Sequence, residues 1–209
     1  MKFTLSIMAM AALANAHGYF QSPGARQPGK EYENSCGMQA YYNMQGSING
    51  NVQGLEQVVA NQPDYNPKTC NLWKCKGMKY ADNTANVQKY TAGQTVDLHF
   101  NIAAPHTGVA NVTIIDLSTP VGTVLSTLKT WDVYASNSVP TQDSQEHFSV
   151  KMPSNLGNKC AQGGKCAIQM NWDAHSIDQT YQSCIDFTLG GGAAKRHARD
   201  FSVAGEEEE

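Results

Sequence analysis

The sequence contains little charge. Asp, Glu, Lys and Arg make up only 16% of the 209 residues, and the formal net charge at pH 7 is −3. Four of the negative charges are the glutamates at 206–209, so the rest of the chain is nearly neutral. Proteins that bind nucleic acid or anionic membrane surfaces need clustered lysine and arginine side chains. The composition therefore argues against both partners and fits a neutral polysaccharide better.

Long apolar runs are also scarce. The apolar stretch at 3–13 follows Lys2 and precedes Ala14, Asn15 and Ala16, which form the small-x-small pattern that signal peptidase accepts. The stretch is too short, and too soon followed by glycine, proline and charge, to span a bilayer of about 30 Å. We therefore expect a signal peptide at 1–16, a secreted extracellular protein, no membrane partner, and a mature chain that begins at His17.

The remaining length suits one domain with a hydrophobic core. From 190 onward the chain has a glycine-rich start, a dibasic pair and an acidic end, and it cannot bury enough apolar surface to fold alone. We expect a folded domain at 17–189, monomeric, followed by a disordered tail at 190–209.

Short runs rich in Val, Ile, Thr and aromatic residues occupy the second half of the chain, separated by turn residues. They are 95–102, 109–117, 121–129, 147–152, 166–172 and 181–189. Several short strands without helical periods between them predict an all-β protein, an antiparallel β-sandwich of the immunoglobulin or fibronectin-III type. The segment 22–90 is rich in Gly, Pro, Asn and Gln, and it predicts long decorating loops with a short helix at 51–60.

Six cysteines follow the leader, at 36, 70, 75, 160, 166 and 184. An even number in a secreted chain predicts three disulfides. Cys70 and Cys75 lack a second close pair with finger-like spacing, which disfavours a structural zinc site. Cys160 and Cys166 flank a glycine pair and look like a hairpin closed on itself. Asn111 begins an Asn-Val-Thr glycosylation acceptor, which predicts an exposed position.

A histidine at a free N-terminus has unusual chemistry. His17 would offer two nitrogen donors from one residue, the α-amine and the imidazole Nδ1. One further imidazole would complete a set of three nitrogens, and nitrogen-rich tetragonal sites suit Cu(II) best among the common metals. The alternative is that a histidine stands behind the leader by chance.

The second imidazole has to come from elsewhere in the chain. The candidates are His99, His106, His147, His175 and His197. His197 lies in the expected tail, His99 lies inside an alternating strand, and His147 begins a strand after a polar loop. His106 lies in the turn between two predicted strands, where Pro105 and Gly108 fix the chain. A rigid turn is where a scaffold presents a ligand, so we favour His106.

The segment before the last cysteine carries two further candidates. Gln179 and Tyr181 are two residues apart, so they face the same side of a strand, and Cys184 faces the other side, where a disulfide can form. A tyrosine can occupy a distant axial position beside copper, and a glutamine can hydrogen-bond a bound oxygen species. The alternative is that Tyr181 is an ordinary core residue.

Together these segments resemble the copper-dependent lytic polysaccharide monooxygenases. The matching pieces are His17-Gly18 with Pro23 and Arg26, the run AAPHTG at 103–108, and the run QTYQSC at 179–184. The runs SCGMQAYYN, CNLWKCKG, DNTANVQKYTAGQ and APHTGVANV are most similar to auxiliary-activity family 16, a fungal group reported as cellulose-active. The resemblance extends over most of 17–189.

The resemblance implies a role for each site residue. His17, through its amine and Nδ1, and His106 would be the ligands of one copper ion, and Tyr181 would be the axial residue. Gln179 would orient the oxygen species. His175 stands only four residues before Gln179, a shorter spacing than in the fungal family, and would assist it.

The resemblance also bears on the disulfides and on one alternative axial residue. It implies the pairs Cys70–Cys184, Cys36–Cys75 and Cys160–Cys166. In a different alignment Phe187 takes the axial place.

The implied activity is oxidative cleavage of crystalline polysaccharide. Cellulose with oxidation at C1 is favoured, with chitin as the second substrate, and the reaction needs an extracellular electron donor and hydrogen peroxide or dioxygen. The sequence marks out no pair of carboxylates for a glycoside hydrolase. Two other classes remain: a non-catalytic copper-binding protein with the same two histidines, and a carbohydrate-binding module without a redox role.

Overall fold

The structure is a computed structural model, and it describes residues 17–190. The predicted signal peptide and the part of the predicted tail beyond 190 lie outside the described residues. Among the described residues, no helix is long and apolar enough to cross a membrane.

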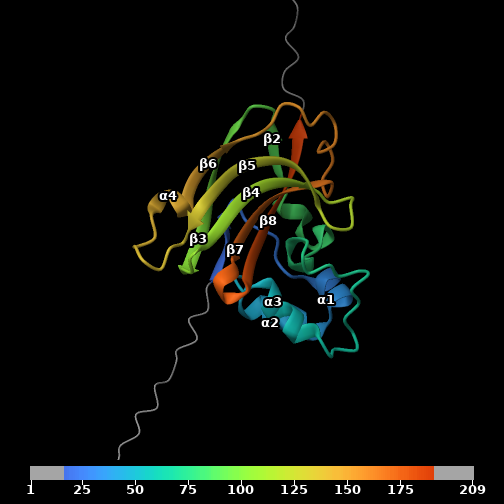
Figure 1. Cartoon of the computed structure of the whole chain (residues 1–209). Helices are drawn as coiled ribbons and strands as arrows, with labels where there is room; N and C mark the ends of the chain where they lie inside the picture. The colour runs from blue at the N-terminus through green and yellow to red at the C-terminus, as the bar shows by residue number, and fades with distance from the viewer. Residues whose placement is uncertain (1–16, 191–209) are drawn as a thin grey trace, which may run out of the picture.

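Two β-sheets form the body of the protein (Figure 1). One has the strand order β1 (His17–Ser22), β3 (Thr95–Ala104), β6 (His147–Lys151). The other has the order β2 (Gln88–Thr91), β8 (Gln179–Gly190), β7 (Cys166–Ala174), β4 (Gly108–Asp116), β5 (Thr123–Tyr134). Neighbouring strands are antiparallel except for β2 and β8. The predicted antiparallel β-sandwich is confirmed.

All six predicted strands are present, as β3 to β8, and their bounds differ from the expected ones by a few residues. The sequence analysis missed β1 and β2. Both are short, with six and four residues. A period of two is hard to recognise over so few positions, and β1 also begins directly at the end of the expected leader.

The core lies between the two sheets and is rich in aromatic side chains. Trp172, Tyr134 and Phe100 are fully buried. The rings of Tyr134 and Trp172 lie 5.5 Å apart in an edge arrangement, and those of Phe100 and Tyr134 lie 6.4 Å apart. Edge-to-face pairs at this separation add stability beyond the area they bury. These rings connect β3, β5 and β7 near the start of β4, so the end of the sandwich that carries the β3–β4 loop is well supported.

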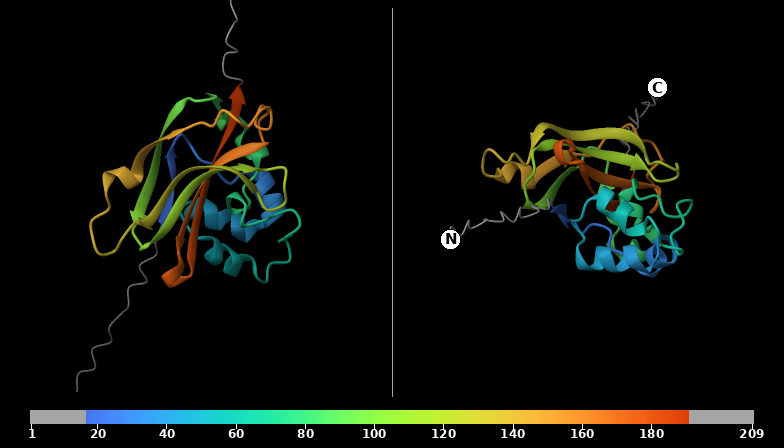
Figure 2. Two further views of the ribbon diagram at one scale, coloured as in Figure 1. Left: turned by 45° about the horizontal axis from the view of Figure 1, so that its top comes forward. Right: turned by 60° about the horizontal axis from the view of Figure 1, so that its bottom comes forward.

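The segment between β1 and β2 forms a separate helical layer beside the five-stranded sheet (Figure 2). It contains α1 (Lys30–Cys36), α2 (Met38–Gly46), α3 (Val52–Val59) and the 3₁₀ helices η1 (Cys75–Gly77) and η2 (Tyr80–Asn86). Its own hydrophobic cluster includes Tyr32, Cys36, Ala40, Met44, Leu55 and Cys70. The predicted helix at 51–60 is confirmed as α3, and the side chain of Asn51 caps it by accepting from the Gly54 amide at 2.6 Å.

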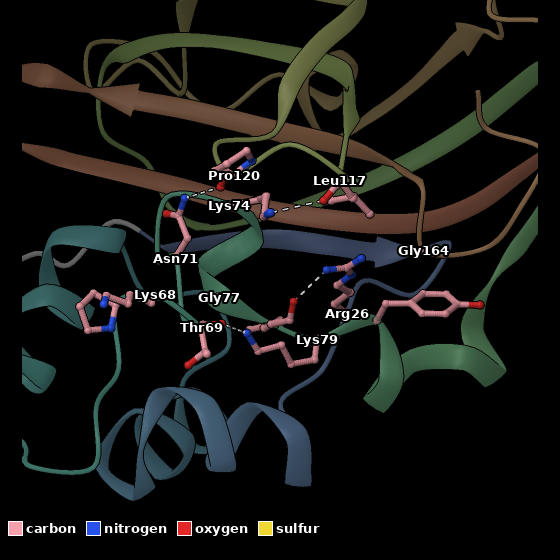
Figure 3. A pocket seen from close by; sticks show the side chains of 13 residues that line it. Arg26, Lys68, Thr69, Asn71, Lys74, Gly77, Lys79, Leu117, Pro120 and Gly164 are labelled. Atoms are coloured by element: carbon pink, nitrogen blue, oxygen red, sulfur yellow. Dashed lines mark hydrogen bonds between the residues drawn. The ribbon is translucent and has the colours of Figure 1, made fainter.

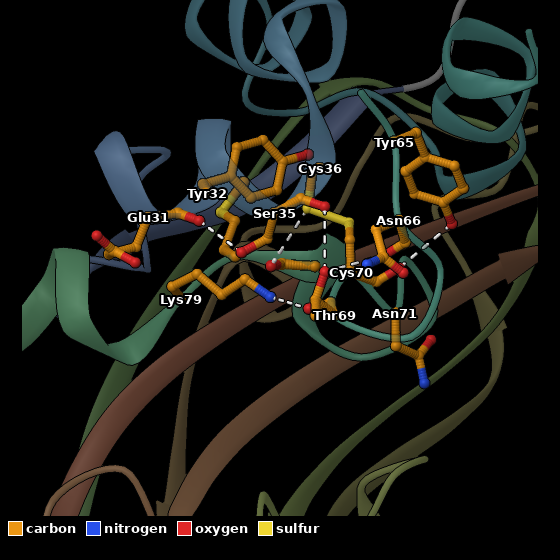
Figure 4. Close-up of a disulfide and its surroundings, with 12 residues drawn as sticks. Glu31, Tyr32, Ser35, Cys36, Tyr65, Asn66, Thr69, Cys70, Asn71 and Lys79 are labelled. Carbon is orange, nitrogen blue, oxygen red and sulfur yellow. Dashed lines mark hydrogen bonds between the residues drawn. A yellow bond between two sulfur atoms is a disulfide. The ribbon is translucent and has the colours of Figure 1, made fainter. Parts of the chain in front are cut away.

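Two of the three implied disulfide pairs are wrong. The structure contains Cys36–Cys70, Cys75–Cys184 and Cys160–Cys166. Cys36 ends α1 and faces Cys70 inside the helical layer (Figure 4), where the two Cα atoms are 5.1 Å apart. Cys75, in η1, lies against β8 instead, with its Cα 5.5 Å from that of Cys184. The implied pairing therefore exchanged Cys70 and Cys75, which are only five residues apart in the chain.

The expected exposure of Asn111 is also wrong. Asn111 lies within β4, which is flanked on both sides by β5 and β7, and its side chain is only partly exposed. It pairs with Thr130 on one side and with Asn171 on the other, so a row of polar residues crosses this face of the sheet. Glycosylation at Asn111 stays a prediction.

Candidate metal site

The pairing of β1 with β3 brings the two favoured histidines to the same end of the sandwich. His17 is the first residue of β1 and is paired with Ala104, the last residue of β3. His106 follows two residues later, in the short loop before β4 begins at Gly108. Both histidine side chains are partly exposed. The expected position of His106 in a tight connection between two strands is therefore confirmed.

The loop that carries His106 is fixed from two sides. The indole Nε1 of Trp172 donates to the His106 carbonyl at 3.2 Å, and the amide of Asn137 donates to the Thr107 hydroxyl at 2.8 Å. Gly108 lies so close to β7 that a Cβ atom would overlap the carbonyl oxygen of Asp173. Only glycine fits there, so the loop is held tightly against the sheet.

The imidazole of His106 has a nitrogen without a partner. Its Nδ1 is buried, and it makes no hydrogen bond within the described part of the chain. Buried polar atoms almost always have a partner, and an unprotonated imidazole nitrogen can donate its lone pair to a metal ion. The residues present thus fit a metal held by imidazole nitrogens. No cluster of three or more His, Cys, Asp or Glu side chains suited to a metal occurs within 17–190.

Tyr181 and Gln179 lie on the same face of β8, as their spacing predicted, and they also contact each other. Tyr181 is fully buried in β8, and its hydroxyl donates to Oε1 of Gln179. Its ring lies 4.7 Å from that of Trp172, the residue that holds the His106 carbonyl. Burial raises the pKa of the Tyr181 phenol above its ordinary value of 10.0, although a hydrogen bond with Asn51 opposes the shift. Tyr181 is therefore a neutral hydrogen-bond donor at physiological pH.

The remaining sequence candidates are Phe187 and His175. Phe187 packs against Tyr90 of β2, with their rings 5.9 Å apart, about 20 Å further along β8 than Tyr181. His175 lies exposed in the 3₁₀ turn η3 (His175–Ile177), between β7 and β8. It lines a cavity of about 430 Å³ together with Trp73 and other polar residues. The part of His175 in the site stays a prediction.

The loop before α3 supports the N-terminal strand, and the sequence analysis did not find this contact. The amide of Gly18 donates to the Asn49 carbonyl at 3.2 Å. Nζ of Lys76 donates to the carbonyls on either side of it, those of Ile48 and Gly50, the latter at 3.0 Å. Lys76 thus fixes the 48–50 segment, and this segment in turn binds the amide of Gly18, the residue next to His17.

Lys76 is itself unusual. Its side chain is fully buried, and burial lowers its pKa from 10.5 to about 7. A lysine in a polar, loop-rich segment is normally exposed, so the sequence carries no signal for this role.

The fold and the placement of His17 and His106 define a class of protein: a two-sheet β-sandwich with a candidate two-histidine metal site at one end. A sequence profile of the family described as lytic polysaccharide mono-oxygenase, cellulose-degrading, matches residues 17–187. The chain therefore belongs to the lytic polysaccharide monooxygenase family, as the resemblance implied. A comparison with curated protein sequences finds no significant match.

Solved structures of the same enzyme class are similar at low identity. The cellulose-active enzyme CelS2 in complex with copper is 16% identical, with a TM-score of 0.47, over 84% of this chain and 100% of its own. An AA10 enzyme from Streptomyces lividans is 15% identical, with a TM-score of 0.45, over 82% and 99%. A Bacillus amyloliquefaciens CBM33 in complex with Cu(I) is 14% identical, with a TM-score of 0.41, over 83% and 100%. Identities this low leave the substrate of the present chain open.

Proposed function

We propose that this protein is a secreted, copper-dependent lytic polysaccharide monooxygenase that cleaves crystalline cellulose with oxidation at C1. The observation that carries the proposal is the placement of His17 beside the strand end that leads into His106, whose buried ring nitrogen has no partner. The matched family and the copper in the named structures support the choice of metal. We further propose that the chain belongs to auxiliary-activity family 16.

Copper would be held by His17, through its ring and a free α-amine, and by His106. Bound there, copper supplies the oxidising power that is needed to break a strong C–H bond of the sugar, with an extracellular electron donor and dioxygen or hydrogen peroxide as reactants.

The residues around the ligands position them. Trp172 fixes the His106 loop through its carbonyl, and Tyr181, buried against Trp172, would take the role of the axial residue beside the copper. The Tyr181 hydroxyl donates a hydrogen bond to Oε1 of Gln179. The NH2 group of Gln179 would then be the donor that binds a co-substrate. His175 would be a second such group.

The substrate proposal rests on charge and exposed aromatic rings. A nearly neutral body suits a neutral polysaccharide surface, and the matched family is described as cellulose-degrading. Tyr42 on α2 is 59% exposed, and its ring packs 5.3 Å from that of Tyr41. Tyr19 on β1 is partly exposed next to the site. Flat exposed rings of this kind can stack on sugar rings.

The test is made on copper-loaded protein that begins at His17. With ascorbate and crystalline cellulose, aldonic-acid oligosaccharides are expected by mass spectrometry, and a parallel reaction on chitin decides between the two substrates. Tight copper binding without oxidised products on either substrate would leave only a copper-binding protein. A lack of tight copper binding would remove both copper functions and leave a carbohydrate-binding module.

Matched variants test the ligand set. One extra glycine ahead of His17 keeps both imidazoles and removes only the amine from its position, so it should abolish tight copper binding as His17→Ala does. His99→Ala is the control, because His99 stacks on His147 at 4.1 Å between β3 and β6 and is not a proposed ligand. Copper affinity that survives the added glycine would contradict the amine ligand.

A further inference from the structure

A second cavity lies at the opposite end of the five-stranded sheet from the candidate metal site. It has a volume of about 520 Å³ and lies between the helical layer and the β4–β5 turn, which contributes Leu117 and Pro120 (Figure 3). The His106 loop lies at the start of β4, and the β4–β5 turn lies at its end. The nine residues of β4 therefore separate the two places by about 27 Å. The volume falls within the range of small-molecule sites.

The cavity is strongly cationic. Its charged lining residues are Arg26, Lys68, Lys74 and Lys79, and none of its lining residues is acidic. Arg26 is already neutralised, because its Nε and Nη2 both bind the Asp186 carboxylate at 2.7 Å. None of the three lysines forms a salt bridge within residues 17–190. Three positive charges thus remain in a protein whose net charge is −3.

The lysine side chains are held in place by backbone carbonyls. Nζ of Lys74 donates to the Thr119 carbonyl at 2.8 Å, and Nζ of Lys79 donates to the Thr69 carbonyl. A neutral carbonyl accepts a hydrogen bond from the ammonium group but does not balance its positive charge. An ammonium group has three N–H donors, so these bonds do not use all of them. The Lys74 and Lys79 charges are therefore fixed in position and still available to a ligand.

Burial and mutual repulsion disfavour these charges. The pKa of Lys74 is lowered by burial and by Arg26, and Asp116 offsets part of the effect. The pKa of Lys79 is lowered by burial and then by Lys74 and Arg26, with a partial offset from Asp82 and Glu31. An anion in the cavity would remove the repulsion, whereas a neutral ligand would not.

We propose that this cavity binds an anionic sugar, meaning a carboxylate or phosphate group attached to a sugar ring. The lysines recognise the oxyanion by charge-assisted hydrogen bonds. A free oxyanion would fill only a small part of the volume. The rest of the lining suits a sugar, because Tyr80, Met78, Leu117 and Pro120 contribute aromatic and apolar residues to it. The proposal does not depend on the reaction at the histidines.

The test is calorimetry on the copper-loaded protein with four probes: D-glucuronate, glucose 6-phosphate, inorganic phosphate and glucose. Saturable binding of glucuronate or glucose 6-phosphate is expected, and the comparison of the two tells which oxyanion is preferred. Phosphate should bind more weakly, and glucose should not bind. Failure of both sugar anions below about 10 mM, or equal binding of glucose, overturns the proposal. Phosphate that binds as tightly as the sugar anions overturns the recognition of a sugar.

Variants locate the binding. Lys68→Gln/Lys74→Gln/Lys79→Gln should weaken affinity at least about tenfold, since it replaces the charge-assisted hydrogen bonds to the oxyanion by weaker neutral ones. Lys151→Gln, on exposed β6 in the other sheet, is the matched control and should bind as the wild type does. Unchanged affinity in the triple variant places the ligand elsewhere, for instance on copper, and refutes the site. Lys68 is exposed, so Lys68→Gln alone gives a second measurement if the triple variant does not fold.

Discussion

Lys76 provides a sharp test of the support for the N-terminal strand. It is fully buried, donates to the carbonyls of Ile48 and Gly50, and has no salt bridge within the described residues. Burial lowers its pKa from 10.5 to about 7. A neutral amine has two N–H donors, and the two carbonyls use both. The informative substitution is Lys76→Met, which keeps a long unbranched side chain, one heavy atom shorter, and removes the titrating group.

The expected effect has a definite sign and size. The difference between pKa values of 10.5 and about 7 corresponds to about 5 kcal/mol. Below pH 7 the lysine is charged in both the folded and the unfolded chain. The cost of burying the charged amine therefore lowers the free energy of unfolding by its full amount there. Between pH 7 and 10.5 the unfolded chain binds more protons than the folded one, so the free energy of unfolding rises with pH. The rise from pH 7 to pH 9 amounts to about 2 kcal/mol.

Lys76→Met should lose this contribution to the pH dependence. It also leaves two carbonyls without a donor, at a cost of about 1–3 kcal/mol each that does not vary with pH. Relative to the variant, the wild type should therefore gain about 2 kcal/mol between pH 7 and pH 9. Urea unfolding at pH 6, 7, 8 and 9 with the disulfides intact measures this difference, and the other titrating groups cancel in the comparison. A difference that stays constant across the four pH values would refute the reasoning.

Two further substitutions test the supports of the fold and of the site. Arg26→Met leaves the Asp186 carboxylate buried without its partner and should lower the free energy of unfolding by about 3–5 kcal/mol, seen as a melting temperature roughly 10 °C lower. Arg26→Met/Asp186→Leu should recover much of that loss in the same thermal scan, and a double variant no more stable than the single one argues against a buried pair. Gly108→Ala places a methyl group against the Asp173 carbonyl and should shift the His106 loop, lowering copper affinity by calorimetry about tenfold. Wild-type copper affinity in that variant would show that the loop position does not matter.

The sequence was most informative where local patterns decide the structure. Short runs rich in Val, Ile, Thr and aromatic residues predicted six of the eight strands in the described part of the chain, and the Pro105–Gly108 turn placed His106 correctly because strand ends and turn residues act locally. The spacing of Gln179 and Tyr181 predicted that they share one face of a strand, because a strand repeats every two residues, and in the structure they are hydrogen-bonded.

The remaining features depend on contacts between distant segments. The helices α1 and α2 have seven and nine residues and largely polar sequences, so they show little amphipathic pattern and are stabilised by packing around Cys36 and Cys70. The choice between Cys70 and Cys75 as the partner of Cys184 depends on how the helical layer lies against β8. Lys76 looks like any surface lysine until the 48–50 segment is seen folded over it.

The disulfide between Cys75 and Cys184 joins parts of the chain that are 109 residues apart. Lys76 is the next residue after Cys75, so the same bond that joins η1 to β8 also anchors the lysine that holds the 48–50 segment and, through Asn49, the start of β1. A chain that has not yet formed this bond lacks the covalent link that fixes η1, and with it Lys76, against the last strand β8. Oxidative folding is therefore expected to strengthen metal binding, because in the reduced chain the start of β1 would be positioned by its pairing with β3 without the support of a fixed 48–50 segment.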